Sequence, residues 1–237
     1  MAAPSTSPSV SCVMPAFNEE ASIVMAVANV RGALEHLTSD SEIIVVDDGS
    51  TDHTGALLDE MAAAGQLRVL HFPVNRGYGC TLRAGFAAAT RPLLFFCDSD
   101  NQFDPMDLGR LLPLIEEADI VVGHRVARCD GMLRGVLSRG YNVLASMLLD
   151  VRVRDVNCAF KLMRREALAG LALVSTGYSI NAEMLARAAR AQLRIREVPV
   201  THWPRRAGRS KVGTADVPWS LFALLSLRWT LRDSPPG

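Results

Sequence analysis

The sequence predicts an α/β fold with a mostly parallel central sheet covered by helices on both faces. Three observations support this class. The first 124 residues alternate short apolar runs with segments of helical period, and the apolar runs are nearly unbroken, as in strands buried on both faces. The chain has 237 residues, 49% of them hydrophobic and 21% charged, which is enough to bury one full core.

The first half contains five expected strands that alternate with four expected helices. The strands are expected at residues 11–14, 42–46, 68–72, 93–97 and 119–123, and the helices at 18–36, 52–64, 79–89 and 105–117. Asn18 suits an N-cap with Glu19 and Glu20 in the first turn, and Pro105 suits a first helical position. Such short connections favour parallel strands whose carboxyl ends share one edge of the sheet.

The pattern changes after residue 124. We expect helices at 134–149, 181–191 and 216–232, strands at 159–163 and 195–200, and a basic, glycine-containing loop at 203–213. We assign residues 10–213 to one domain, divided into an N-terminal half (10–124) and a C-terminal half (125–213). A C-terminal amphipathic helix follows at 214–233. The ends, 1–9 and 234–237, are expected to be disordered.

Charge is divided unevenly between the halves. The formal net charge is zero, but residues 1–124 contain 6 basic and 17 acidic side chains, whereas residues 125–237 contain 19 basic and 8 acidic ones. This asymmetry indicates that the halves meet around an anionic ligand, with a cation on the acidic side. The alternative is that the two surfaces lie on unrelated helices. Nucleic acid is not an expected partner, because the basic residues are scattered without aromatic platforms.

Composition also limits the compartment. No run of 18 apolar residues is present, so no membrane-spanning helix is expected. The first eight residues lack the basic and apolar regions of a secretory signal, and the five cysteines lack disulfide or zinc spacing. We therefore expect a cytoplasmic protein, and contact with the cytoplasmic face of a membrane stays open.

Polar side chains follow three of the expected strands. Residues 15–19 follow the first strand, 47–50 the second and 98–102 the fourth, and together they supply five Asp or Glu side chains. Because these loops should share one edge of the sheet, the carboxylates should converge there. Carboxylates repel one another, so a divalent cation or a donor-rich ligand is the expected partner.

Asp98 and Asp100 are the candidate metal ligands. They lie two residues apart directly after an unbroken apolar strand, and Gln102 adds a neutral oxygen. Hard oxygen ligands of this kind suit Mg²⁺ or Mn²⁺, with the remaining positions left to water and phosphate. The alternative for so short a motif is a loop of solvated acids or helix caps.

Nine motifs in order carry a resemblance to a known family. They are PxxNE at 15–19, VVDDGS at 45–50, DxDxQ at 98–102, GHR at 123–125, LSRG at 137–140, DVNCAFK at 155–161, NAEM at 181–184, EVPV at 197–200 and RxxGxSK at 205–211. The chain resembles the family 2 inverting glycosyltransferases of GT-A fold, and more narrowly the polyprenyl-phosphate (dolichyl-phosphate) mannose or glucose synthase branch. The resemblance implies a Rossmann-like, mostly parallel sheet and a C-terminal, acceptor-side helical subregion.

The resemblance also implies roles on the donor side. Pro15, Phe17 and Glu19 would hold the base and ribose of a nucleotide sugar, and the Val46 backbone and Asp48 would read the base. Phe17 replaces the tyrosine usual in that branch, which leaves packing without a hydroxyl. The implied nucleotide-sugar-binding residues are Pro15, Phe17, Glu19, Val46, Asp48, Asp98, Ser99, Asp100, Arg125, Arg205 and Lys211. The implied metal ligands are Asp98, Asp100 and Gln102, with Mg²⁺ or Mn²⁺ as the cofactor.

On the acceptor side, Arg125 and Arg139 would face a donor or acceptor phosphate, and Arg205 with Lys211 would close over the diphosphate. A lipid monophosphate is already anionic and needs cations rather than a base. An alcohol or amine acceptor would need a carboxylate base, for which Asp155 and Glu183 are candidates, although each has an equal alternative as an orienting group. The implied catalytic residues are therefore Asp98, Asp100, Arg125, Arg139, Asp155 and Glu183.

Three further features stay open. The C-terminal helix has an apolar face with Trp219, Phe222, Leu225 and Trp229, which suits either a membrane surface or packing on the domain. Residues 75–79 precede a helix and are able to cradle a phosphate through backbone N–H groups. His202 is expected to be a packed or capping histidine rather than a metal ligand.

The sequence thus predicts a metal-dependent inverting glycosyltransferase that moves mannose or glucose from GDP-mannose or UDP-glucose to a polyprenyl phosphate. An alternative keeps the donor and uses a soluble acceptor, such as a natural-product or peptide hydroxyl. A catalytically silent nucleotide-binding protein is the third hypothesis. The expected partners are the nucleotide sugar, the acceptor, and a membrane surface or membrane protein.

Overall fold

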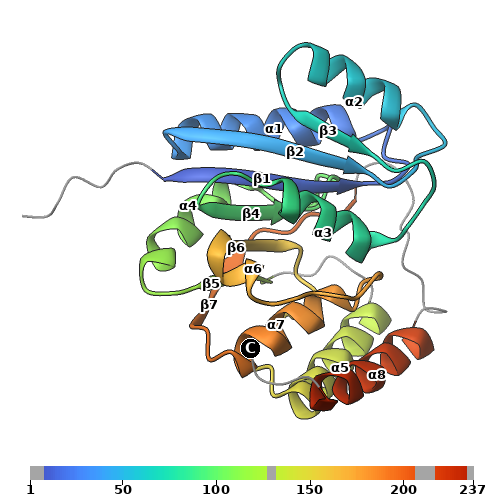
Figure 1. Ribbon diagram of the computed structural model, residues 1–237, viewed down its shortest axis with the longest axis vertical. Helices are drawn as coiled ribbons and strands as arrows, with labels where there is room; N and C mark the ends of the chain where they lie inside the picture. Colours follow the sequence, from blue (N-terminus) through green and yellow to red (C-terminus); the bar gives the residue numbers. More distant parts are fainter. Residues whose placement is uncertain (1–7, 127–131, 206–216, 234–237) are drawn as a thin grey trace, which may run out of the picture.

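The computed structural model describes residues 8–126, 132–205 and 217–233, and these form a seven-stranded sheet with helices (Figure 1). The strands are β1 (Ser9–Ala16), β2 (Asp40–Asp47), β3 (Arg68–His71), β4 (Leu93–Cys97), β5 (Ile120–Arg125), β6 (Phe160–Arg164) and β7 (Ile195–Val200). The helices are α1 (Ile23–Leu37), α2 (Thr54–Ala63), α3 (Tyr78–Ala88), α4 (Leu108–Leu111), α5 (Met132–Leu149), α6 (Arg165–Ala169), α7 (Ile180–Arg190) and α8 (Val217–Asp233), with 3₁₀ turns η1 (Pro105–Asp107) and η2 (Leu112–Glu116).

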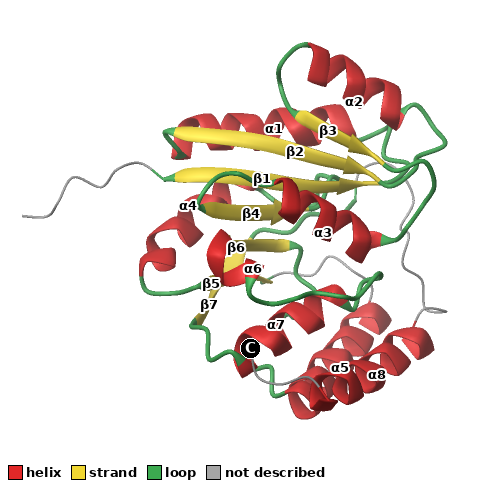
Figure 2. Ribbon diagram, in the orientation of Figure 1, coloured by secondary structure: helices red, strands yellow, loops and turns green. Residues whose placement is uncertain are grey.

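The sheet has the order β3-β2-β1-β4-β6-β5-β7 and is mostly parallel, as expected. Only β6 runs antiparallel to its neighbours, β4 and β5. Helix α3 packs on β1 and β2 in front of the sheet in Figure 2, and α1 lies behind it. The carboxyl ends of β1, β2, β4 and β5 therefore point to the same edge, where polar loops follow them.

The core explains why the central strands read as unbroken apolar runs. All five residues of β4 are buried, and so are seven of the eight residues of β1. Gly85 of α3 faces β1 so closely that a Cβ there would lie 2.3 Å from Val13 Cγ1. The missing side chain lets α3 approach the sheet and brings its N-terminal turn to the polar edge.

Two expected helices differ from the structure. Helix α1 begins at Ile23, because Asn18 has a φ of +49° and the Glu19 carbonyl closes a turn on Ser22 N and Ile23 N. Glu19 and Glu20 therefore precede the helix instead of forming its first turn. The expected helix at 105–117 is divided into η1, α4 and η2, and Pro113, which has no N–H to donate, lies at the start of η2.

The expected C-terminal helical subregion is formed by α5, α7 and α8, which pack on one another beyond β6 (Figure 1). Leu224, Leu227 and Leu231 on one side of α8 are buried, whereas Phe222 and Trp229 are more than 60% exposed. The helix therefore has a packed apolar side and an exposed apolar side. Within the described residues, no helix is long and apolar enough to cross a membrane. At the other end, Ser9, expected in the tail, begins β1.

Candidate active site

A cavity of about 460 Å³ opens at the carboxyl ends of the parallel strands. It brings together loops after β1, β2, β4 and β5 with the residues that precede α3 and α7 and those that follow β7. Its lining residues are Pro15, Ala16, Phe17, Glu19, Asp48, Asn75, Gly77, Tyr78, Thr81, Asp98, Ser99, Asp100, Gln102, Arg125, Gly177, Tyr178, His202 and Arg205. Ten of the residues predicted from the sequence are among them.

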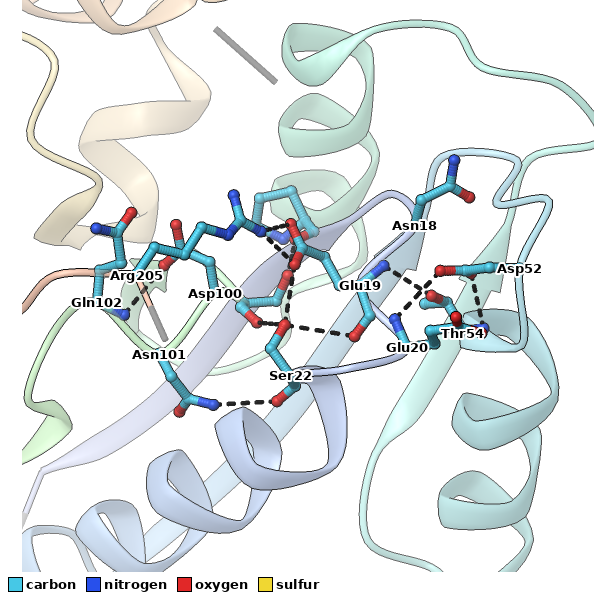
Figure 3. A network of polar contacts seen from close by, with 12 residues as sticks. Asn18, Glu19, Glu20, Ser22, Asp52, Thr54, Asp100, Asn101, Gln102 and Arg205 are labelled. Atoms are coloured by element: carbon cyan, nitrogen blue, oxygen red, sulfur yellow. Dashed lines mark hydrogen bonds and ion pairs between the residues drawn. The ribbon is translucent and has the colours of Figure 1, made fainter. Parts of the chain in front are cut away.

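The turn after β1 is fixed by contacts with the start of α2 (Figure 3). Glu19 N donates to Thr54 Oγ1 at 2.8 Å. Thr51 N donates to Asn18 Oδ1, also at 2.8 Å. These contacts hold a left-handed residue, Asn18, at the point where the chain leaves the sheet. Pro15 and Phe17 in the same turn line the cavity, as the resemblance implies.

Glu19 joins the two charged halves of the molecule. Its buried carboxylate accepts hydrogen bonds from Ser22 Oγ at 2.9 Å and from the Arg205 guanidinium (Figure 3). Although burial opposes it, the hydrogen bond to Glu19 raises the pKa of Arg205. The predicted cationic residue therefore does reach the donor side, although it is 186 residues away in the sequence.

Asp48 is placed as an anchor of the next loop. Its Oδ1 accepts from Arg76 N at 2.7 Å, and its Oδ2 accepts from Gly77 N at 3.0 Å. Gly77 has a φ of +95°, and a Cβ there would lie 2.6 Å from the Thr176 carbonyl oxygen, so only glycine fits. Val46 is fully buried in β2 and does not line the cavity with its side chain.

The predicted metal ligands meet as expected. Asp98 and Asp100 both line the cavity, and burial raises the pKa of each carboxyl, with the Asp100 charge adding to the rise at Asp98. Gln102 Nε2 donates to the Trp203 carbonyl at 3.0 Å, so the amide oxygen is the Gln102 atom that would serve as a metal ligand. Ser99 Oγ donates to the Pro15 carbonyl at 2.7 Å and fixes the loop between the two carboxylates.

These residues fit a hard divalent cation. Two desolvated carboxylates repel each other unless a positive charge lies between them, and an amide oxygen suits the same ion. Among the described residues, no group of three or more His, Cys, Asp or Glu side chains is arranged to hold a metal by itself. The donor set of Asp98, Asp100 and Gln102 therefore suits an ion that takes its remaining ligands from water or a bound phosphate.

Arg125 and Asp155 form a buried ion pair beside the cavity. Arg125 Nε and Nη2 donate to Asp155 Oδ2 and Oδ1 at 2.7 and 2.9 Å, and the side chains are 15% and 5% exposed. Arg125 lines the cavity at the end of β5, and Asp155 does not. This contact is the kind expected of an orienting group, which is one of the two roles that the sequence left open for Asp155.

Glu183 also has an orienting environment. It is fully buried in α7, accepts hydrogen bonds from Val174 N and Ser175 N, and pairs with Arg187 Nε at 2.8 Å. It does not line the cavity. The Arg139 side chain and all of Lys211 lie outside the residues whose structure is described, so their expected roles stay predictions.

Aromatic residues near α3 are the main addition to the predicted set. Tyr78 Oη donates to Asp98 Oδ1 at 3.0 Å, and its ring stacks on Tyr178 with 4.9 Å between the centroids. Residues 75–79 had a sequence signal as a phosphate-binding turn, whereas Tyr178 had none. The His202 ring packs edge-on against the Phe103 ring, with 5.0 Å between the ring centroids, as expected for a packed histidine. His202 also lines the cavity.

Comparison with known proteins gives the family. The sequence model of glycosyl transferase family 2 matches residues 11–171, more than half of the chain. The chain belongs to glycosyl transferase family 2. The matched segment includes Asp98, Asp100 and the Arg125–Asp155 pair, so most of the cavity of this glycosyltransferase lies in the family domain.

Curated relatives are similar to this glycosyltransferase over most of its length. Polyprenol monophosphomannose synthase of Mycolicibacterium smegmatis is 31% identical, covering 93% of this chain and 86% of that protein. Dodecaprenyl-phosphate galacturonate synthase of Rhizobium johnstonii is 32% identical over 96% of this chain and 69% of its own. Undecaprenyl-phosphate mannosyltransferase of Micrococcus luteus is 30% identical, with coverages of 84% and 86%. All three names combine a polyprenyl-type phosphate with a sugar.

Solved structures confirm the GT-A fold. Glucosyl-3-phosphoglycerate synthase of Mycobacterium tuberculosis, in complex with phosphoglyceric acid, aligns with a TM-score of 0.73 at 25% identity, covering 94% of this chain and 80% of that one. The same enzyme with Mn²⁺, UDP-glucose and phosphoglyceric acid aligns with a TM-score of 0.71 at 24% identity, with the same coverages. The expected α/β class and the family are therefore both confirmed.

Proposed function

We propose that this glycosyltransferase moves a hexose, mannose or glucose, from GDP-mannose or UDP-glucose to a polyprenyl phosphate, with inversion and with Mg²⁺ or Mn²⁺. Relatives at 30–32% identity whose names join sugars to polyprenyl phosphates support the acceptor class. The half-buried carboxylates of Asp98 and Asp100, whose pKa values are both raised, support the metal.

On the donor side, the turn after β1 and the loop held by Asp48 form the wall for the nucleotide. Asp98, Asp100 and Gln102 would hold the metal ion, which when bound offsets the negative charge that develops on the leaving diphosphate. Arg205, held by Glu19, lies beside this position and adds a second positive charge.

The observation that carries the acceptor assignment is the state of the carboxylates in the cavity. Among the described residues, four carboxylates line it: Glu19 pairs with Arg205, Asp48 accepts two backbone N–H groups, and Asp98 and Asp100 form the metal set. None remains as a general base for an alcohol. A phosphate acceptor needs no such base, and Arg125 provides a cation that opposes repulsion between acceptor and donor.

We further propose that the exposed apolar side of the helical subregion contacts the cytoplasmic face of a membrane. The exposed apolar side chains there are Val143, Leu144 and Met147 of α5 and Phe222, Leu225 and Trp229 of α8. Arg228 Nη1 donates to the Leu148 carbonyl at 2.7 Å, which ties α8 to α5. A lipid acceptor has to leave the bilayer near the enzyme, and an apolar surface of this kind binds bilayers.

A flotation experiment tests the membrane surface. The double variant Phe222→Ser/Trp229→Ser should float less with vesicles of anionic phospholipid than the wild-type protein does, and should keep its affinity for the nucleotide. The matched control is Met25→Ser on α1, another exposed apolar residue. Equal flotation of all three proteins would contradict this surface.

A soluble acceptor is the second candidate. It is favoured by the structural neighbour at 25% identity, which was solved with phosphoglyceric acid, a small soluble molecule. That compound is also anionic, so it fits the same arginine-lined side of the cavity.

Radiolabelled GDP-mannose and UDP-glucose, each offered with a short polyprenyl phosphate and Mg²⁺ or Mn²⁺, test the proposal. Label should move into the organic phase with one donor and stay in water when EDTA is added. Label that stays in water with both donors, although the protein binds a nucleotide sugar, would remove the lipid acceptor and favour the soluble one.

A further inference from the structure

Lys161 is a fully buried cation on β6, the antiparallel strand between β4 and β5. It is one of two lysines in a chain with 23 arginines. Its ammonium group donates to three acceptors: the Cys158 carbonyl at 2.5 Å, the Val156 carbonyl at 3.3 Å and Asn181 Oδ1 at 2.8 Å. Three acceptors around one point suit an ammonium group, whereas a planar guanidinium is larger and spreads its donors.

The buried position of Lys161 disfavours its charged form. Burial lowers the pKa of Lys161 to about 8. The Phe96 ring lies 5.0 Å from Nζ and covers another side of the charge. A buried ammonium group is unfavourable unless each of its N–H donors has an acceptor. The three acceptors of Lys161 are therefore held in fixed positions around it.

One contact of Lys161 leads to the metal side of the cavity. Burial raises the pKa of the Tyr78 hydroxyl, and the Asn181 side chain, at the start of α7, is close enough to oppose that rise. Tyr78 in turn donates to Asp98 Oδ1 at 3.0 Å. The orientation of a metal-side carboxylate is thus linked to Lys161 through two side chains.

The other contacts lead to the acceptor side. The carbonyls of Val156 and Cys158 belong to the turn that begins at Asp155, where Cys158 N donates to the Asp155 carbonyl at 3.2 Å. The Asp155 carboxylate holds Arg125 by two hydrogen bonds. Fixing this turn therefore fixes the arginine that lines the cavity.

We propose that Lys161 is a positioning residue of the transfer reaction, which clamps the turn at 155–158 to the start of α7 and so keeps Asp98 and Arg125 at a fixed separation. Lys161 itself does not line the cavity. The roles of Asp98 and Arg125 in this proposal rest on the proposed function, whereas the contacts that join them do not.

Kinetics of Lys161→Met provide the first test. The variant keeps the length of the side chain and removes all three hydrogen bonds, so kcat should fall about 10- to 100-fold, as expected for a misplacement near 1 Å. The Mn²⁺ concentration for half-maximal rate and the KM for the polyprenyl phosphate should both rise. The matched control is Arg164→Met on the far end of β6, which also removes a cation that donates to two carbonyls, those of Ala118 and Ile115. The control variant should leave both the Mn²⁺ concentration for half-maximal rate and the KM for the polyprenyl phosphate unchanged.

Asn181→Asp separates the two branches. The aspartate keeps an oxygen for Lys161 and replaces the amide NH₂ group, which lies near Tyr78, with a second oxygen. The Mn²⁺ requirement should therefore rise, while the KM for the lipid phosphate stays within about twofold of the wild-type value. An equal rise in both quantities, or in neither, would contradict the branched path.

A measurement on the wild-type protein covers the case in which Lys161→Met does not fold. Selective ¹³C,¹⁵N-lysine labelling gives two side-chain signals, and Lys211→Arg identifies that of Lys161. Mg²⁺ with UDP or GDP should shift the Lys161 Nζ signal, although the ligand does not touch it. If nucleotide binding moves backbone signals of the cavity and leaves Lys161 unchanged, the proposal is overturned. If the wild-type protein transfers no sugar to lipid phosphate, the proposed function fails, and this measurement still tests Lys161.

Discussion

The acidic and basic halves of the molecule build their sides of the cavity in different ways. Before β5, site residues lie in loops directly after parallel strands and are fixed by nearby backbone groups; Gln102 N, for example, donates to Asp100 Oδ1 at 3.1 Å. After β5, they are fixed by buried partners far away in the sequence, as Arg125 is by Asp155, 30 residues later. On the acidic side, Asp98 and Asp100 repel each other, whereas Arg125 forms a satisfied ion pair with Asp155.

This difference has a physical consequence. The carboxylates of the acidic half are held near one another at an electrostatic cost, so removing one should harm activity without harming the fold. In the basic half, Arg125 and Arg205 each pair with a buried carboxylate, Asp155 and Glu19, so removing either arginine should harm both activity and stability. The following predictions test this contrast.

The largest effect is expected for Asp100→Ala. Loss of a metal ligand should lower kcat by about 10²–10³-fold, because a bound divalent cation contributes several kcal/mol to the transition state. The melting temperature without metal should stay equal or rise, since one of two repelling carboxylates is gone. Assays with Mn²⁺ and thermal unfolding give both quantities, with Asp104→Asn as the control, because Asp104 caps η1 and does not line the cavity. Near-wild-type activity would remove the metal assignment.

Arg125→Gln should affect both activity and stability. It leaves the Asp155 carboxylate buried without its partner, which costs about 3–5 kcal/mol, and so lowers the melting temperature by roughly 10 °C. The KM for the polyprenyl phosphate should rise more than the KM for the donor. The double variant Arg125→Gln/Asp155→Asn should regain stability without regaining acceptor affinity. An unchanged melting temperature of the single variant would contradict the claim that the paired arginines stabilise the fold.

Tyr78→Phe should have a smaller effect, confined to the acidic side. It removes the hydroxyl that donates to Asp98, and the loss of a group that orients a metal ligand costs about tenfold in metal affinity or activity. A Mn²⁺ titration of initial rates should show the shift, and the KM for the acceptor should not change. A change in acceptor KM alone would place Tyr78 on the other side of the reaction.

The smallest effect concerns His71, which lies outside the cavity. Burial disfavours its protonated form, but hydrogen bonds to Asp47 at 2.9 Å and Asp59 at 3.1 Å outweigh this and raise the pKa of His71. Its stabilising contribution is therefore complete below about pH 6.5 and is lost as the pH rises through the elevated folded-state value. Thermal unfolding should show His71→Gln about 1–3 °C less stable than wild type at pH 6, with a smaller difference at pH 9. A larger difference at pH 9 than at pH 6 would contradict the raised pKa of His71.

The fold was predictable where local pattern decides it. Apolar runs give the positions of β1, β2, β4 and β5, because strands that are buried on both faces consist largely of apolar residues. The start of α1 was not predictable from the sequence, because Asn18 adopts a left-handed conformation that is stabilised by its contacts with the residues before α2. The antiparallel direction of β6 also depends on pairing with distant strands, which periodicity does not contain.

The candidate site divides in the same way. Asp98, Asp100 and Gln102 were predictable because they directly follow a buried strand. The roles of Asp155 and Glu183 were open in the sequence, since a carboxylate beside an arginine and one beside a substrate look alike until tertiary contacts are known. Tyr178 had no signal, because its stacking partner lies 100 residues earlier in the chain.

The central claim is that this cavity joins a metal-bound donor to an acceptor that is already anionic. Transfer of labelled hexose should therefore be measured with a polyprenyl phosphate and with the corresponding polyprenol, at equal concentration and with the same donor and metal. Label in the organic phase with the phosphate, and none above background with the alcohol, is the result that we predict. Equal or faster transfer to the alcohol would contradict the claim, because each of the four carboxylates that line the described cavity already has another role.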